Sequence, residues 1–227
     1  MELDGVLLVD KSENLTSHDV VEIIRRKFKL KKVGHSGTLD PGATGLLILL
    51  LGQATKKSSY FFTLDKIYST ILTLGIKTTT ADQAGIIIQE KRVPDYTREH
   101  LIKVFKSFTG TITQIPPMYS AKKIGGKKLY ELAHRGIEIK RQPNTIKIKN
   151  LKITEIKLPF VNFLVRCTKG TYVRTLCEDI GEALGCGAHM SALRRLFCGR
   201  YKVENALTID KILTLDNAAL AEKVVRL

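Results

Sequence analysis

The chain has 227 residues, of which 37 are basic and 22 acidic, so its formal charge is +15 at pH 7. Its 44% apolar and 26% charged residues suffice for an ordinary core and exclude disordered, collagen-like and disulfide-scaffold proteins. The longest apolar run, residues 46–51, is far shorter than the roughly 20 residues of a membrane-spanning helix, and no basic leader precedes an apolar stretch at the N-terminus. We therefore expect a cytoplasmic protein without membrane contact.

Strand and helix signals alternate at the start of the chain. Residues 5–10 are predicted as a strand, and Thr16 and Ser17 can cap a helix that follows it. The glycine-rich residues 34–45 run directly into a predicted strand over residues 46–51. A loop that leads into a core strand is well placed for function.

The middle of the chain contains two more strand patterns and two helix patterns. Strands are predicted over residues 65–76 and 85–93, and a helix capped by a threonine over residues 97–108. Residues 110–115 should be extended, and the Pro-Pro pair that follows should end this segment. Residues 127–135 are predicted as a short helix that ends at the following glycine.

The last third reads as two half-buried strands and a helix. Apolar and polar residues alternate from residue 145, a second strand follows over residues 160–168, and a helix is predicted from about residue 172 to 184. Consecutive strands with irregularly placed helices predict an α+β fold with a mixed, mostly antiparallel central sheet and flanking helices and loops. No linker or internal repeat divides the chain.

The four cysteines form no CxxC pair and have no regular metal-ligand spacing. We therefore expect free, mostly buried thiols and no metal site. The four are Cys167, Cys177, Cys186 and Cys198.

The positive charge is unevenly distributed. Residues 120–150 contain nine basic side chains and two acidic ones. Residues 25–32 contain several basic side chains and no acidic one. A third cluster comprises Arg194, Arg195, Arg200 and Lys202. Such clusters favour a phosphate-binding surface for nucleic acid, although charge alone does not distinguish DNA from RNA.

The densest chemical signal is the glycine-rich loop 34–45, which presents His35 and Asp40. It lacks the GK[ST] ending of a phosphate-binding loop. No HExxH motif or paired carboxylates occur nearby, which disfavours metal hydrolases and glycosidases. Taken alone, Asp40 before Pro41 also fits an ordinary turn.

This loop resembles the catalytic loop of the TruB family of tRNA pseudouridine synthases, whose signature is close to GHxGxLDPxATG. The resemblance extends over roughly residues 3–213. The other matching segments are residues 5–11, 16–21, 65–68, 114–121, 169–175, 184–189 and 193–195.

The resemblance implies an enzyme that isomerises uridine-55 in the T-loop of tRNA to pseudouridine, with base flipping. Asp40 would be the nucleophile, with Arg174 beside it to favour its ionised form. Tyr68 would lie against the target base and act in proton transfer. The residues expected to bind the substrate are His35, which would fill the space left by the flipped base, Tyr172 and Leu193. Neither a cofactor nor a metal is expected, and the T-arm of tRNA is the expected partner of a monomeric enzyme.

Some positions depart from the family pattern. Ser12 stands where the family usually has proline, Ile67 and Ser69 flank Tyr68 where arginines are common, and Thr79 replaces a common acidic residue. We expect a catalytic domain over residues 1–213 and a short tail over residues 214–227, too short for the PUA-type RNA-binding module of many bacterial members.

Two other functions stay open at this point. One is a non-catalytic protein that binds or folds tRNA, and the other is a guide-directed pseudouridine synthase, whose relatives share the aspartate loop. The residues also leave open whether Asp40 attacks C1′ of the ribose or C6 of the uracil.

Overall fold

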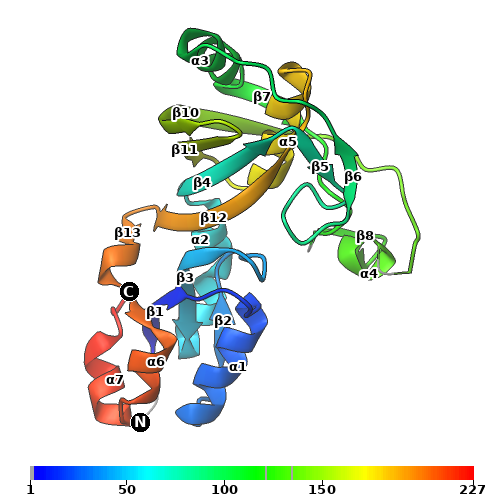
Figure 1. Cartoon of the computed structure of the whole chain (residues 1–227). Coiled ribbons are helices and arrows are strands. Elements are labelled where there is room, and N and C mark those ends of the chain that lie inside the picture. Colours follow the sequence, from blue (N-terminus) through cyan, green and yellow to red (C-terminus); the bar gives the residue numbers. More distant parts are fainter. Residues whose placement is uncertain (1–2, 121, 134) are drawn as a thin grey trace. The chain divides into compact units, whose positions relative to one another are not determined.

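The computed structural model describes residues 3–120, 122–133 and 135–227 (Figure 1). The chain forms two compact units. The first contains the chain up to Tyr68 together with Leu193–Leu227, and the second is Ser69–Ala192. Strands β4 (Lys66–Leu74) and β12 (Ala188–Cys198) contribute residues to both units. The predicted division into residues 1–213 and 214–227 stays a prediction.

The first unit is built on strand β3 (Thr44–Leu51). It pairs antiparallel with β1 (Gly5–Lys11) along the whole length of β1, and parallel with β12 at Arg194 and Arg195. The hydrogen-bonded order in this unit is β14-β1-β3-β12, with β2 on β3 and β13 on β12. These shorter strands are β2 (Val33–His35), β13 (Tyr201–Lys202) and β14 (Leu207–Thr208).

The six residues from Leu46 to Leu51 are completely buried, which explains why this strand reads as an unbroken apolar run. Figure 1 shows α1, α6 and α7 beside the strands of this unit. Helix α1 (Ser17–Lys27) starts with a capping box between Thr16 and Asp19. The other helical segments here are η1 (Gly52–Lys57), α2 (Ser58–Thr63), η2 (Val203–Asn205), α6 (Ile209–Leu213) and α7 (Asn217–Lys223).

The second unit contains the strand order β12-β4-β11-β10-β7. Its long hairpin is formed by β10 (Asn144–Lys157) and β11 (Phe160–Cys167), and β7 (Gly110–Gln114) pairs antiparallel with β10. Phe105 of α3 and Phe163 of β11 meet edge to face at 5.2 Å in the core. The remaining elements are β5 (Ile76–Thr78), β6 (Ile87–Glu90), α3 (Arg98–Ser107), β8 (Lys123–Ile124), β9 (Lys127–Lys128), α4 (Leu129–Ala133) and α5 (Val173–Ala183).

The fold class is confirmed: the strand pairings are mostly antiparallel, with parallel pairs between β1 and β14 and between β3 and β12. All four cysteines are buried and free, as expected. Within the described residues, no helix combines the length and apolar character needed to cross a membrane.

Three element boundaries differ from the prediction. The strand predicted over residues 65–76 is interrupted at Gly75, whose φ of +85° separates β4 from β5. The strand predicted over residues 85–93 shortens to β6. The helix predicted from residue 127 begins only at Leu129, because Lys127 and Lys128 pair with β8.

Candidate active site

The predicted catalytic loop connects β2 to β3 in the first unit. His35 is the last residue of β2 and pairs with Leu49 of β3. Asp40 lies in a tight turn, where the amide of Ala43 donates to the carbonyl oxygen of Asp40 at 3.0 Å. Gly37 and Gly45 bracket this turn with φ angles of +95° and +98°. Glycine populates this backbone region without steric cost, so both ends of the loop adopt these conformations without strain.

Ser17, the first residue of α1, holds the peptide immediately before Asp40. Its side chain is almost completely buried. The Oγ atom accepts a hydrogen bond from the amide of Leu39 at 2.8 Å and donates to the carbonyl oxygen of Leu39 at 3.2 Å. One hydroxyl thus satisfies both polar groups of a buried loop residue, and α1 is tied to the position of Asp40.

Lys11, at the end of β1, reaches the other side of the turn. Its ammonium donates to the carbonyl oxygens of Ser12 at 2.9 Å, Leu15 at 2.6 Å and Pro41 at 3.1 Å. Burial lowers the pKa of Lys11 to about 8, against the opposing attraction of the Asp40 carboxylate. Lys11 therefore carries a positive charge near Asp40 at neutral pH.

Arg195 of β12 is the second buried cation at this loop. Its Nε donates to the carbonyl oxygen of Leu46 at 2.6 Å and its Nη2 to that of Gly37 at 3.2 Å. Only 1% of Arg195 is exposed, so its predicted place on a phosphate-binding surface is wrong. Backbone carbonyl groups, which need donors when buried, hold the guanidinium inside the protein.

Arg194, the neighbour of Arg195, is committed to an ion pair. It forms two hydrogen bonds to the carboxylate of Asp10, at 2.9 and 2.7 Å. This bidentate geometry ties β12 to β1 and raises the pKa of Arg194. Of the predicted third cluster, Arg200 and Lys202 are exposed.

The remaining predicted site residues of the first unit are His35, Tyr68 and Leu193. Burial lowers the pKa of His35, so its imidazole is neutral at physiological pH. Tyr68 is buried in β4 and Leu193 is half-buried in β12, and these two strands are neighbours in the sheet order.

Arg174 is buried in the first turn of α5, in the second unit. Its Nη1 lies 3.1 Å from Oδ2 of Asp82, and its Nη2 donates to the carbonyl oxygen of Tyr119 at 2.7 Å. Asp82 is itself fixed, because its Oδ1 accepts from Thr80 Oγ1 at 2.6 Å and from the amide of Ala84 at 3.0 Å. The guanidinium is thus oriented by a carboxylate that the surrounding loop holds in place.

Tyr172 is the residue before α5. Its amide donates to Oε1 of Gln114 at 2.8 Å, and Nε2 of Gln114 donates to its carbonyl oxygen at 3.0 Å. The amide side chain of Gln114 therefore fixes the backbone of Tyr172 from both sides. The pairing of Arg174 with Asp40, which belong to different units, stays a prediction.

A cavity of about 650 Å³ lies in the second unit beside this arrangement. Tyr119, which binds Arg174, lines it together with Ala81, Thr175 and Asp179. Burial raises the pKa of Asp179 to about 6. The wall of this cavity therefore includes an acidic group, Asp179, that changes charge close to neutral pH.

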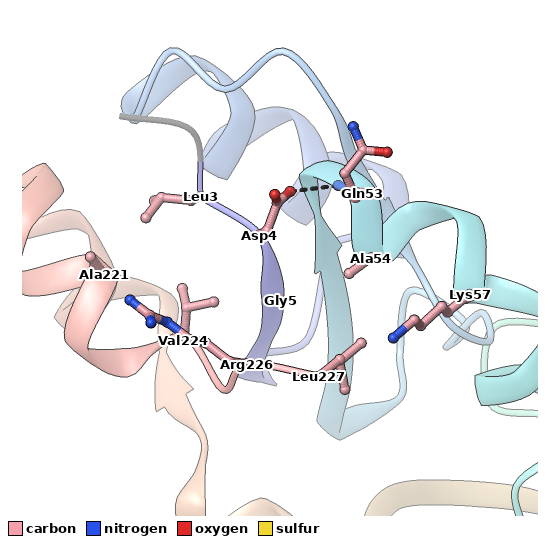
Figure 2. A pocket seen from close by; sticks show the side chains of 10 residues that line it. All are labelled: Leu3, Asp4, Gly5, Gln53, Ala54, Lys57, Ala221, Val224, Arg226 and Leu227. Carbon is pink, nitrogen blue, oxygen red and sulfur yellow. Dashed lines mark hydrogen bonds between the residues drawn. The ribbon is translucent and has the colours of Figure 1, made fainter.

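A second cavity, of about 390 Å³, lies in the first unit where the two ends of the chain meet. Figure 2 shows Leu3, Val224 and Leu227 around it, and the bond from the amide of Gln53 to Asp4 Oδ1, which is 2.6 Å long. None of the predicted site residues lines this cavity.

Comparison with known proteins assigns the family. The model described as "TruB family pseudouridylate synthase (N terminal domain)" matches residues 25–173, and the "tRNA pseudouridylate synthase B C-terminal domain" model matches residues 174–226. The chain belongs to the TruB family of pseudouridylate synthases. It is accordingly an isomerase.

Two curated relatives of this TruB family chain carry the same name. It is similar to the tRNA pseudouridine synthase B of Opitutus terrae, with 46% identity over 99% of the chain and 93% of the relative. The tRNA pseudouridine synthase B of Alkaliphilus oremlandii is 49% identical over 95% of the chain and 72% of the relative.

Two solved structures are similar to the chain in both sequence and fold. A chain of "a Cbf5-Nop10-Gar1 Complex" superposes with a TM-score of 0.73 at 33% identity over 93% of the present chain. A chain of an "H/ACA RNP bound to a substrate RNA containing 2'-deoxyuridine" superposes with a TM-score of 0.69 at 30% identity over 92%. The TruB family chain spans about half the length of these two chains.

Four residues that contact predicted site residues or their neighbours in this TruB family member were not predicted for this role from the sequence: Lys11, Ser17, Asp82 and Arg195. Each has at least one partner far away in the chain; Leu39, for example, is 22 positions after Ser17. The available signal was weak: the charged residues Asp10 and Lys11 end a strand whose other residues are apolar or glycine. A charge in that place needs a buried partner.

Proposed function

We propose that the chain converts uridine-55 in the T-loop of tRNA to pseudouridine, without a cofactor, as a monomer in the cytoplasm. The observation that carries this proposal is the similarity to proteins named tRNA pseudouridine synthase B, at 46% and 49% identity over nearly the whole chain. The well-supported loop around Asp40 is consistent with it, because a nucleophile needs a fixed position.

The reaction breaks the N1–C1′ bond of uridine, rotates the uracil and forms a C5–C1′ bond. The proton on C5 is released, and N1 gains a proton, so atoms and charge balance. In the proposal, the Asp40 carboxylate forms a transient covalent bond to the substrate, at C1′ or at C6, and is regenerated at the end. Neither route requires a metal or a redox step.

The surroundings of Asp40 suit a carboxylate that acts in its ionised form. Two buried cations, Lys11 and Arg195, bind carbonyl oxygens of the loop and attract negative charge. Arg174 is proposed to lie beside Asp40 when the substrate is bound. Asp82 would then orient the guanidinium that faces the nucleophile.

Access to the stacked uridine requires base flipping. A neutral imidazole at His35 is suited to stack in the space that the flipped base leaves. In the proposal, Tyr68 lies against the uracil and takes part in proton transfer, and Tyr172 and Leu193 complete the walls of the pocket.

The test is release of tritium from T-arm RNA labelled at C5 of uridine-55. The wild-type chain should release it without any guide RNA, and Asp40→Asn should release none. Asp95→Asn provides a matched control, because Asp95 is an exposed carboxylate outside the site. Release that survives Asp40→Asn would refute the nucleophile.

The same assay separates the two other functions. Tight binding of tRNA by the wild type without tritium release would identify a non-catalytic tRNA-binding protein. Release that occurs only when a guide RNA is added would identify a guide-directed enzyme.

A further inference from the structure

A cationic surface of the first unit carries two exposed aromatic side chains. It is formed by residues 52–64, which contain η1 and α2, and by residues 197–203, which contain the turn of the β12–β13 hairpin. We call it the α2–hairpin surface. Neither segment contains an aspartate or a glutamate. Their four basic residues, all exposed, are Lys56, Lys57, Arg200 and Lys202.

The two segments are packed against each other. The amide of Gly199 in the hairpin turn donates to the carbonyl oxygen of Asp65 at 2.8 Å. The buried ring of Phe61 lies 5.8 Å from that of Tyr201. The guanidinium of Arg200 lies over the Tyr201 ring at 5.3 Å. These contacts hold Arg200 beside α2.

The two exposed rings flank Phe61 in the sequence. Tyr60 is 61% exposed and Phe62 is 43% exposed, whereas Phe61 is fully buried in the core. Tyr60 stands edge-on to Phe61, with ring centroids 5.3 Å apart, so its position is supported while much of its side chain faces solvent. An exposed ring next to an arginine suits an unpaired nucleobase, which stacks on the ring while the cation binds phosphate.

We propose that the α2–hairpin surface binds an unpaired nucleotide of the RNA substrate, whose base stacks on Tyr60 and whose phosphate pairs with Arg200. This inference rests on the proposed function for the choice of RNA as partner. Charge complementarity supports it, since the two segments carry four cations and no anion. A second copy of the chain that met this surface through its own α2–hairpin surface would bring the same positive charge and be repelled.

Binding variants test the stacking contact directly. We measure retention of full-length tRNA on filters for Tyr60→Ala, Tyr60→Phe and Phe160→Ala, the last being an exposed ring in the second unit as a control. Tyr60→Ala should weaken binding about tenfold, since a stacked base contributes about that much. Tyr60→Phe and Phe160→Ala should bind like the wild type.

A fluorescence experiment reports on the same contact without mutating the ring away. The chain contains no tryptophan, so Tyr60→Trp introduces a single reporter. Its emission should be quenched by tRNA, and that of Phe160→Trp should not. Arg200→Ala should lower the slope of log affinity against log salt by about 0.7, the share of one phosphate contact in a single strand.

Unchanged affinity in Tyr60→Ala, equal loss in Tyr60→Phe, or unquenched emission from Tyr60→Trp would overturn the inference. Quenching that grows with protein concentration in the absence of RNA would assign the surface to a second copy instead. These readouts need no turnover. Failure of tritium release with intact, Tyr60-dependent binding would therefore count against the proposed function and leave the surface standing.

Discussion

Gly45 joins the predicted catalytic loop to the core of the first unit, and its replacement by alanine should lower the stability of the protein. Its φ is +98°, and a Cβ atom there would collide with the backbone oxygen of Arg195 and lie 2.8 Å from the Arg195 nitrogen. Residue 45 is also the parallel pairing partner of Arg195. The added carbon would therefore push β12 away from β3.

Gly37 provides a matched control in the same loop. Its φ is +95°, but a Cβ atom would be 3.6 Å from the nearest atom, Nη1 of Arg195, which is an ordinary contact. Each substitution should lower the free energy of unfolding by about 1–2 kcal/mol, because alanine is strained in a left-handed backbone conformation. Gly45→Ala should lower it by about 1–3 kcal/mol more, because the new Cβ atom collides with the Arg195 backbone in the sheet.

Urea unfolding followed by circular dichroism measures both free energies of unfolding. We expect Gly45→Ala to cost about 2–5 kcal/mol and Gly37→Ala about 1–2 kcal/mol. Gly45→Ala should also slow tritium release in the folded protein, because a shifted Arg195 would release the carbonyl oxygens of Gly37 and Leu46. A loss in Gly45→Ala no larger than in Gly37→Ala would refute this reasoning.

Three further predictions concern Ser17, Lys11 and Asp179. Ser17→Ala should slow single-turnover tritium release about tenfold or more at saturating tRNA while leaving tRNA affinity unchanged, because the peptide before Asp40 loses both its hydrogen bonds. Lys11→Met should lower the free energy of unfolding by about 2–3 kcal/mol, since three carbonyl oxygens lose a charged donor; in the wild type, the rate should fall above pH 8, where Lys11 loses its proton. Burial raises the pKa of Asp179 to about 6, so the fold disfavours its ionised form and loses stability as the pH rises from 4 to 6. Asp179→Asn should therefore raise the melting temperature by about 2–4 °C at pH 8 and leave it unchanged at pH 3.5.

Each of these three predictions has a result that would contradict its physical reason. Ser17→Ala that changes tRNA affinity but not the rate would show that Ser17 supports binding rather than the loop. A flat rate profile from pH 7 to 9.5 would show that the charge of Lys11 is not needed. Equal stabilisation by Asp179→Asn at both pH values would show that packing, not charge, is responsible.

Some features of this protein follow from short stretches of sequence alone. The capping residue Thr16 and the apolar spacing after it define α1, and six consecutive apolar residues define the core of β3. The same holds for α3, where Thr97 caps the helix as predicted. Signals of this kind lie within one or two turns of backbone, and the loop around Asp40 likewise carries its family likeness in twelve adjacent letters.

Contacts between residues far apart in the chain could not be predicted from those local signals. Strand β12 has no regular alternation, since both Arg195 and Cys198 are buried while Arg194 pairs with Asp10, and it was not predicted. Arginine is usually a surface residue, and only the nearby carbonyl groups of the folded loop explain why Arg195 lies inside.

The sequence by itself therefore determined helices α1 and α3, the core of β3, the fold class and the family, because these depend on local periodicity and on contiguous motifs. Tertiary structure alone decided which residues contact the predicted site residues and their neighbours. Ser17 meets Leu39 across 22 residues and Arg174 meets Asp82 across 92. Such partners are selected by burial, because a polar group inside the protein must find a hydrogen-bond partner wherever the chain brings one.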